Sequence, residues 1–134
     1  MVKCFNNWDK VAKSIKPAAR LVVKKTAFDA VGHVKAQIVA NDQVDTGFML
    51  NSPYVVTSDS STYKSGEKAL PEVPRPTSET EAIVAVAAEY AIHQEYGTVH
   101  IPGRPFFRPG MERVRPGFDK AMQLLKQKME EAAK

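Results

Sequence analysis

The chain has 134 residues, one cysteine, nine prolines and a formal net charge of +4. That length is enough for one domain with its own core, and a single cysteine excludes an internal disulfide framework or a zinc site with several cysteines. The longest apolar run, 82–88, is far too short to cross a membrane. The first residues contain no apolar segment typical of a secretory signal. We therefore expect a soluble domain made in the cytoplasm, a reducing compartment.

Charge is divided unevenly along the chain. Residues 1–40 carry eight lysines and arginines against two acidic residues, residues 41–100 carry three against nine, and residues 101–134 carry eight against four. The basic ends can neutralise the acidic middle within one fold, or they can leave complementary faces that suit head-to-tail association. Because a pure nucleic-acid binder is more often basic throughout, the pattern favours self-assembly over a general affinity for nucleic acid.

Residues 9–40 are predicted to be helical, in two pieces. Pro17 ends the first piece and is suited to the first turn of the second, which runs to about Ala40. Gly32, in the middle of the second piece, is interpreted as a position of close packing. The side chains that we expect to face the core are Leu21, Phe28, Val31 and Ile38, supported by Ala27, Ala30 and Val34.

Residues 45–57 are predicted to form a turn and a strand, and residues 81–97 a second strand and a short helix. Between them, residues 58–80 contain five serines, three threonines and three prolines, with few large apolar side chains. Such a segment cannot bury much surface, so we expect a long arm that becomes ordered against a neighbouring subunit.

Residues 101–134 are predicted to form an extended segment followed by a C-terminal helix. Its apolar residues keep a spacing of three and four across Pro116 and Gly117, which indicates one kinked helix. The predicted fold class is α+β: a single domain, 1–134, in which a long N-terminal helix and a C-terminal helix pack on a small antiparallel sheet, with a long extended loop or arm.

Asp45, Thr46 and Gly47 form the string that looks most like part of an enzyme. A D-T-G loop supplies one carboxylate of an aspartic-protease dyad, and a dimer would supply two. The residues before Asp45 are polar rather than apolar, so a helix-to-strand turn with Gly47 at positive φ is the favoured interpretation. His93 is interpreted as a surface residue of the short helix, and no catalytic group, cofactor or metal is expected.

Four arginines lie close together in sequence, at positions 104, 108, 113 and 115. They could bind phosphate at the start of a helix, or they could pair with Glu89, with Glu95 or with a neighbouring subunit, and we favour the interface. Phe106 and Phe107 lie between prolines; one is expected to fill the core and the other to anchor an interface.

Several short strings follow one another in a characteristic order. They are Asp45, Thr46 and Gly47 with Leu50 and Ser52, then Tyr90 and Ala91, then Glu95, Tyr96, Gly97 and Thr98, and then Arg104, Pro105, Phe106, Phe107, Arg108 and Pro109. Their order and spacing, between two flanking helices, resemble the tail-component family of tailed bacteriophages, whose members are neck or tail-completion proteins that join head to tail. The resemblance covers residues 9–130.

The sequence departs from that family's pattern in three places. Gly110 stands where the family usually has alanine, and Pro116 and Gly117 interrupt a helix that is usually continuous. Residues 58–80 are also longer and richer in proline than the family core requires. These departures concern the geometry of the C-terminal helix and of the arm.

The resemblance implies a non-enzymatic structural protein of the virion, made in the host cytoplasm. Such proteins form a homo-oligomeric ring at the head–tail junction, with six-fold symmetry favoured over twelve-fold. The implied partners are the connector or head-completion protein on one side and the tail-terminator or tail-tube protein on the other. Channel DNA would pass through the ring without sequence-specific contacts, and no membrane is involved.

Roles for individual residues follow as hypotheses. Asp45, Thr46 and Gly47 would fix the turn into the sheet, and Gly97 would permit a tight exit from the short helix. Glu95 would tie the short helix to residues 104–108 through charge-assisted bonds. Two other classes of function stay open on the sequence: a dimeric aspartic-type hydrolase that uses Asp45, and a small basic DNA-binding module.

Overall fold

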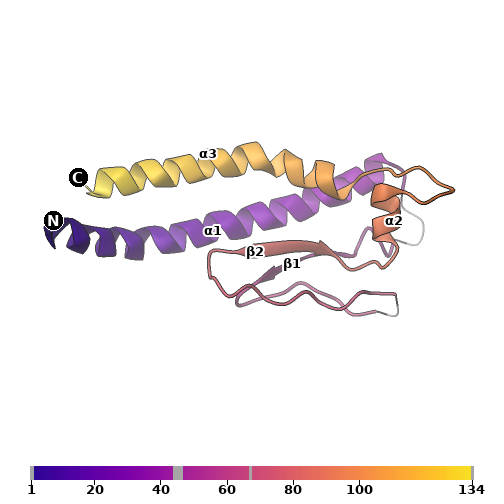
Figure 1. Ribbon diagram of the computed structural model, residues 1–134, viewed down its shortest axis with the longest axis horizontal. Coiled ribbons are helices and arrows are strands. Elements are labelled where there is room, and N and C mark those ends of the chain that lie inside the picture. Colours follow the sequence, from indigo (N-terminus) through magenta and orange to yellow (C-terminus); the bar gives the residue numbers. More distant parts are fainter. Residues whose placement is uncertain (1, 44–46, 67, 134) are drawn as a thin grey trace.

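The computed structural model of the chain describes residues 2–43, 47–66 and 68–133. The helices are α1 (Val2–Ala40), α2 (Ala91–Tyr96) and α3 (Phe107–Ala133), and the strands are β1 (Pro53–Thr57) and β2 (Ala82–Val86). Figure 1 shows α1 and α3 side by side in opposite directions, with the sheet on the other side of α1 from α3. The predicted α+β fold is confirmed. None of the described helices has the length and apolar content of a membrane span.

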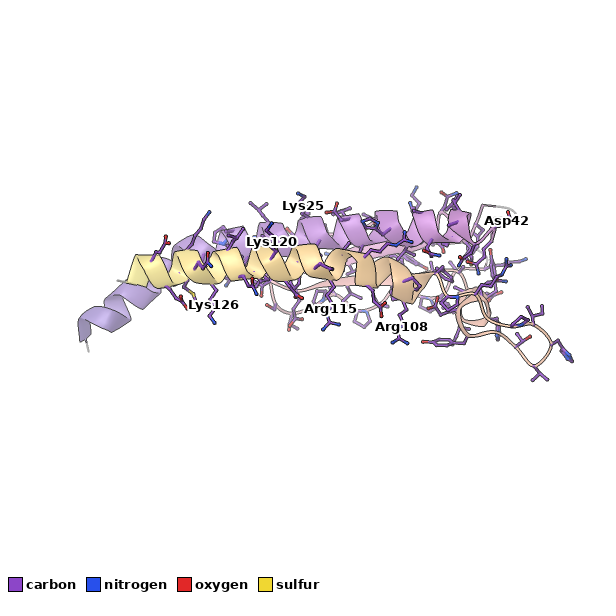
Figure 2. All side chains as sticks on the ribbon, turned by 90° about the horizontal axis from the view of Figure 1, so that it is seen from above. Lys25, Asp42, Arg108, Arg115, Lys120 and Lys126 are labelled. Atoms are coloured by element: carbon purple, nitrogen blue, oxygen red, sulfur yellow. The ribbon has the colours of Figure 1, made fainter. Side chains whose placement is uncertain are left out.

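The N-terminal helix is one element rather than two. α1 continues through Pro17, so the prediction of a break there is wrong. A proline inside a helix removes one hydrogen bond and bends the axis, but the turns on either side keep their own bonds. In Figure 2 the first turns of α1 run at an angle to the rest of the helix.

The buried face of α1 is made of its smaller side chains. Of the predicted stripe, Ile38 is buried and Val31 is half-buried, but Leu21 is 69% exposed and Phe28 is 45% exposed. Gly32 is also exposed, and a Cβ added there would meet nothing within 4 Å, so it does not mark close packing. Among the α1 side chains that the structure describes, 15–40, the buried ones are Ala27, Ala30, Val34 and Ile38. Their spacing of three and four keeps them on one face, where small side chains let neighbouring elements approach closely.

The sheet consists of β1 and β2, paired antiparallel with Pro53 opposite Val86 and Thr57 opposite Ala82. All five residues of β1 are buried, whereas those of β2 are half-buried. α1 contacts both strands, and residues of the 58–80 segment pack against Tyr54 of β1 on the sheet's other face. The sheet therefore lies between α1 and the 58–80 segment.

Residues 58–80 pack against the sheet of their own chain. Tyr63 and Val73 pack against a buried cluster that contains Tyr54, and the Tyr54 and Tyr63 rings meet edge to face at 5.1 Å. The Tyr54 hydroxyl oxygen accepts the N–H of Val73 at 3.1 Å, and the Leu70 N–H donates to the Ala87 carbonyl oxygen at 2.7 Å. No described residue of this segment is fully buried, so the prediction that it buries little surface is confirmed. Its aromatic and aliphatic side chains nevertheless cover the sheet of their own chain, and ordering against a neighbouring subunit stays a prediction.

The C-terminal helix runs without interruption through Pro116, as the apolar spacing predicts. Met111, Val114 and Phe118 are half-buried and Leu125 is buried, whereas Met122 is 37% exposed. α3 packs mainly on α1. The two long helices thus share one seam, which begins at the end of the molecule that carries α2 (Figure 1).

Candidate interaction site

Glu95 on α2 holds the start of α3. One oxygen of its carboxylate accepts the N–H groups of Phe106 and Phe107, at 2.8 and 2.9 Å, and the other accepts the N–H of Arg108 at 3.2 Å. The first N–H groups of a helix lack partners within it, and the helix dipole favours a negative charge there. The expected tie to this segment is therefore made through backbone N–H groups rather than arginine side chains, and it sets the direction in which α3 leaves α2.

A second set of bonds joins the end of α1 to the same segment. The Asn41 amide donates to the Pro105 carbonyl oxygen at 2.8 Å, and the Gln43 amide donates to the Arg104 carbonyl oxygen at 3.0 Å. The Arg104 guanidinium donates to the Asn41 carbonyl oxygen at 2.7 Å. Carbonyl groups at the end of a helix lack partners within it, so Arg104 both satisfies one of them and fixes the extended segment in place.

Phe106 and Gly110 bring the two long helices into contact. Phe106 is only 1% exposed and belongs to the core cluster with Val34, Ile38 and Met49, so it is the member of the aromatic pair that fills the core. A Cβ added at Gly110 would lie 2.7 Å from both Cα and Cγ2 of Val34. The departure from the family's usual alanine therefore has a structural reason, because α1 passes too close to α3 at this point for any side chain.

The loop between α2 and α3 is a tight hairpin. We call residues Thr98–Pro102 the tip. The Thr98 N–H donates to the Ile101 carbonyl oxygen at 2.8 Å, and the Thr98 hydroxyl oxygen accepts the N–H groups of His100 and Ile101 at 3.2 and 3.1 Å. Gly97 has φ +84°, and a Cβ there would collide with the backbone of Gly103. Glycine is required on both grounds, and the tip projects beyond α2 (Figure 1).

Beside α2 lies an apolar hollow, which we call the groove. It has a volume of about 650 Å³ and is formed by α2, the start of α3, the end of β2 and Leu70. Phe107, the half-buried member of the aromatic pair, lines it, as do three exposed apolar side chains: Leu70 at 46%, Ile92 at 60% and Tyr96 at 79%. Charged side chains also line it, among them Arg108 and Arg115, which project from α3 away from α1 in Figure 2.

The structure describes only part of the motif predicted near the start of the sheet. Asp45 and Thr46 lie outside the described residues. Gly47 has φ +84°, as a turn there predicts, and its carbonyl oxygen accepts both the backbone and side-chain N–H groups of Asn51, at 3.0 and 2.9 Å. The Ser52 hydroxyl is buried and donates to the Met49 carbonyl oxygen at 2.8 Å. These residues shape the entry into β1.

Three further residues of the predicted set serve the core on the same side: Leu50, Tyr90 and Ala91. Leu50 and Tyr90 are half-buried and pack against the cluster that contains Ala91 and Phe106. The Tyr90 ring also contacts that of Phe48 at 6.3 Å. The structure thus brings most of the predicted strings together at one end of the molecule, while the Gly47 turn lies at the entry to the sheet.

The four arginines do not act as one group. Arg104 bonds the end of α1, Arg108 pairs with Glu112 of its own helix at 3.2 Å, and Arg113 donates to Gln37 at 2.8 Å. Within the described residues none of them forms an ion pair with Glu89 or Glu95. The intramolecular pairing considered on the sequence is therefore wrong, and Arg108 and Arg115 stay at the surface beside the groove.

No three His, Cys, Asp or Glu side chains of the described ranges gather as ligands for a metal ion. Comparisons of the chain with protein-family models, with curated proteins and with solved structures found no match. The site is therefore interpreted from its own geometry and from the sequence resemblance.

Sequence reasoning did not find the groove or the exposed tip. The groove's walls come from residues 70, 86–96 and 106–115, which only the fold assembles. The tip did leave a signal, because Val99 and Ile101 are aliphatic residues within a short loop bounded by Gly97 and Gly103. Val99 is 97% exposed and Ile101 is 63% exposed, which is unusual for aliphatic side chains held rigidly.

Proposed function

We propose that this chain is a structural, non-enzymatic subunit of a tailed-phage virion. In this proposal it forms a homo-oligomeric ring at the head–tail junction, which joins the connector to the tail tube around the DNA channel. The observation that carries the proposal is the convergence of the resembling strings. Glu95, Gly97, Arg104 and Phe106 all serve to build one rigid end of the molecule, with an apolar groove and an apolar tip beside it.

A rigid end with exposed apolar surface supports a role in assembly. Exposed apolar patches on a protein commonly mark contacts with other proteins, and ordered elements lose little conformational freedom on binding. The residue types that the resemblance emphasises hold backbone in place here, through carboxylate-to-N–H and guanidinium-to-carbonyl bonds. Such bonds suit a subunit that must present the same surface to each neighbour in a ring.

The proposal is tested by purifying the protein alone and with connector or tail-tube subunits. Light scattering gives the mass of any assembly, and electron microscopy of negatively stained particles gives its shape. We expect a closed ring, formed by the chain alone or on the connector. A chain that stays monomeric and binds neither partner would contradict the proposal.

The same preparation separates the two other classes of function. A hydrolase would lose activity on a peptide substrate in the Asp45→Asn variant while its assembly stayed intact. A DNA-binding module would bind duplex DNA as a monomer, with an affinity that falls steeply as salt is raised. The ring proposal predicts neither behaviour.

A further inference from the structure

Half of the large apolar side chains that the described chain leaves exposed lie at one end of the molecule. Of the ten such residues, Val99 and Ile101 form the tip, and Leu70, Ile92 and Tyr96 line the groove. The other five are spread over α1 and α3. Because tip and groove are neighbours, this end combines a protruding apolar surface with a recessed one. Exposed apolar residues scattered singly over a protein are ordinary, whereas a cluster of them marks an interaction surface.

The tip is built to protrude. The N–H groups of Thr98, His100 and Ile101 and the Ile101 carbonyl oxygen are bonded within the hairpin. The surface that the tip offers consists of the side chains of Val99 and Ile101 with the exposed His100 between them. The contact between Gly97 and Gly103 leaves no room for a Cβ on either residue and locks the base of the hairpin. The base of the hairpin thus holds the tip where it projects beyond α2 (Figure 1).

The groove is open and mostly apolar. The Glu95 carboxylate at its edge is already engaged by three N–H groups of α3, and Arg108 at its rim is paired with Glu112. An occupant would thus meet Phe107, Met111, Ile92 and Tyr96 without having to strip water from an unpaired Glu95. Glu89 and Arg115 also line the groove, so the occupant has to leave these two side chains in contact with water. Two aliphatic side chains on a narrow hairpin match these demands, whereas a charged segment would not.

We propose that the tip of one copy inserts into the groove of the next copy. Each chain has one tip and one groove, and the two are different surfaces, so the contact is heterologous and can close into a ring. This inference rests on the proposed function, and it names the surfaces by which the ring would form. The rigidity of the tip lowers the entropy lost on docking, and insertion would bury aliphatic surface that the isolated chain leaves in water.

The test uses the full chain with one substitution on each surface. Val99→Asp places a charge on the tip, and Ile92→Asp places one in the groove. Both side chains are exposed, so neither variant is expected to unfold. The matched control is Leu21→Asp on α1, which makes the same change at a position 69% exposed and remote from both surfaces.

We expect each of the two variants to associate at least about tenfold more weakly than the wild type, as loss of a central interface residue predicts, and the control to assemble normally. An equimolar mixture of the two variants should form dimers and nothing larger, because only one intact tip and one intact groove remain. Assembly of either variant at the wild-type level, or a mixture that stays monomeric, would overturn the inference. Rings that form despite both substitutions would leave the proposed function standing and remove the tip-in-groove contact alone.

If the wild-type chain is monomeric, cysteine pairing decides the question. In a Cys4→Ser background, Val99→Cys is mixed with Ile92→Cys under mild oxidation, and Val99→Cys is mixed with Leu21→Cys as the control. Faster disulfide formation in the first mixture supports a weak tip-in-groove contact even though the ring proposal has failed. Equal rates in the two mixtures would overturn the contact.

Discussion

The two ends of the helix pair are held by different means. We call residues 34–43, 91–96 and 103–111 the corner, and residues 15–26 and 118–131 the stalk. The corner contains Val34, Ile38 and Phe106, all less than 2% exposed, and the Glu95 carboxylate joins α2 to α3. In the stalk, Leu125 is the only described side chain that is buried.

Polar contacts follow the same division. Arg104, Asn41 and Gln43 link segments far apart in the sequence within the corner. Beside the stalk, the pairs Lys16–Glu79 and Arg20–Asp59 join exposed side chains, and such pairs contribute little stability. The difference teaches that stability and a defined surface are concentrated at the end where the proposed contacts lie, while the stalk depends on the corner for its place.

The largest effect is expected from removing the central aromatic side chain of the corner. Phe106→Ala would leave a cavity between α1 and α2 and should lower the free energy of unfolding by about 3–5 kcal/mol. Met122→Ala, at a stalk position that is 37% exposed, should cost less than about 1 kcal/mol. Urea unfolding followed by circular dichroism measures both. Equal losses would show that the stalk and the corner contribute alike.

Two glycines test how close the helices are. A Cβ at Gly110 would overlap Val34, so Gly110→Ala should destabilise the fold by about 1–3 kcal/mol despite alanine's better helix propensity. Gly32→Ala, where a Cβ meets nothing, should instead stabilise it by up to about 1 kcal/mol. The same unfolding assay is used for the pair. Changes of the same sign in the two variants would contradict the close approach at Gly110.

Substitutions of Glu95 test how much its carboxylate stabilises the N–H groups at the start of α3. Glu95→Ala leaves three N–H groups at the start of α3 without their acceptor and should cost about 1–3 kcal/mol. Glu95→Gln keeps one acceptor oxygen for the Phe106 and Phe107 N–H groups, but its NH2 group cannot accept the N–H of Arg108. Its loss should therefore be smaller than that of Glu95→Ala, about 0.5–1.5 kcal/mol. Glu112→Ala, which breaks only an exposed pair, is the control and should change stability little. If Glu112→Ala lowered stability as much as Glu95→Ala, the bonds from the Glu95 carboxylate to the start of α3 would have no special role in stabilising the corner.

The smallest effect is expected from the link between α1 and the end of β1. Hydrogen bonds from Thr57 and then from Arg20 lower the pKa of Asp59 below its ordinary value of 3.8. A lowered pKa in the folded state contributes stability above pH 3.8, and the contribution is lost as the pH falls through the lower, folded-state pKa. The wild type should therefore melt slightly above Asp59→Asn at neutral pH, and the two melting temperatures should converge in acid. A difference that grew in acid would contradict this assignment.

Much of the architecture could be predicted from the sequence because the signals are local. The two long helices, the two strands and the short α2 follow from apolar spacing and from turn residues such as Gly47 and Gly97. The α3 helix was predicted to pass Pro116 because its apolar residues keep phase across that position. The local preference of proline predicts a break at Pro17, but that preference does not say whether the turns on both sides remain helical.

By itself, the sequence determined the α+β class, the order of the elements, the core role of one member of the Phe106–Phe107 pair and the tie made by Glu95. Tertiary structure alone decided that Leu21 and Phe28 of the predicted stripe are exposed, whereas Ile38 and the supporting Ala27, Ala30 and Val34 are buried as predicted. The close approach of α3 to α1 at Gly110 leaves room only for a small side chain such as that of Val34. Tertiary structure also decided that the 58–80 segment covers its own sheet and that a groove opens beside the tip. The spacing of residues along a helix shows which of them share a face, whereas the distance to the neighbouring backbone decides which of those side chains can be buried.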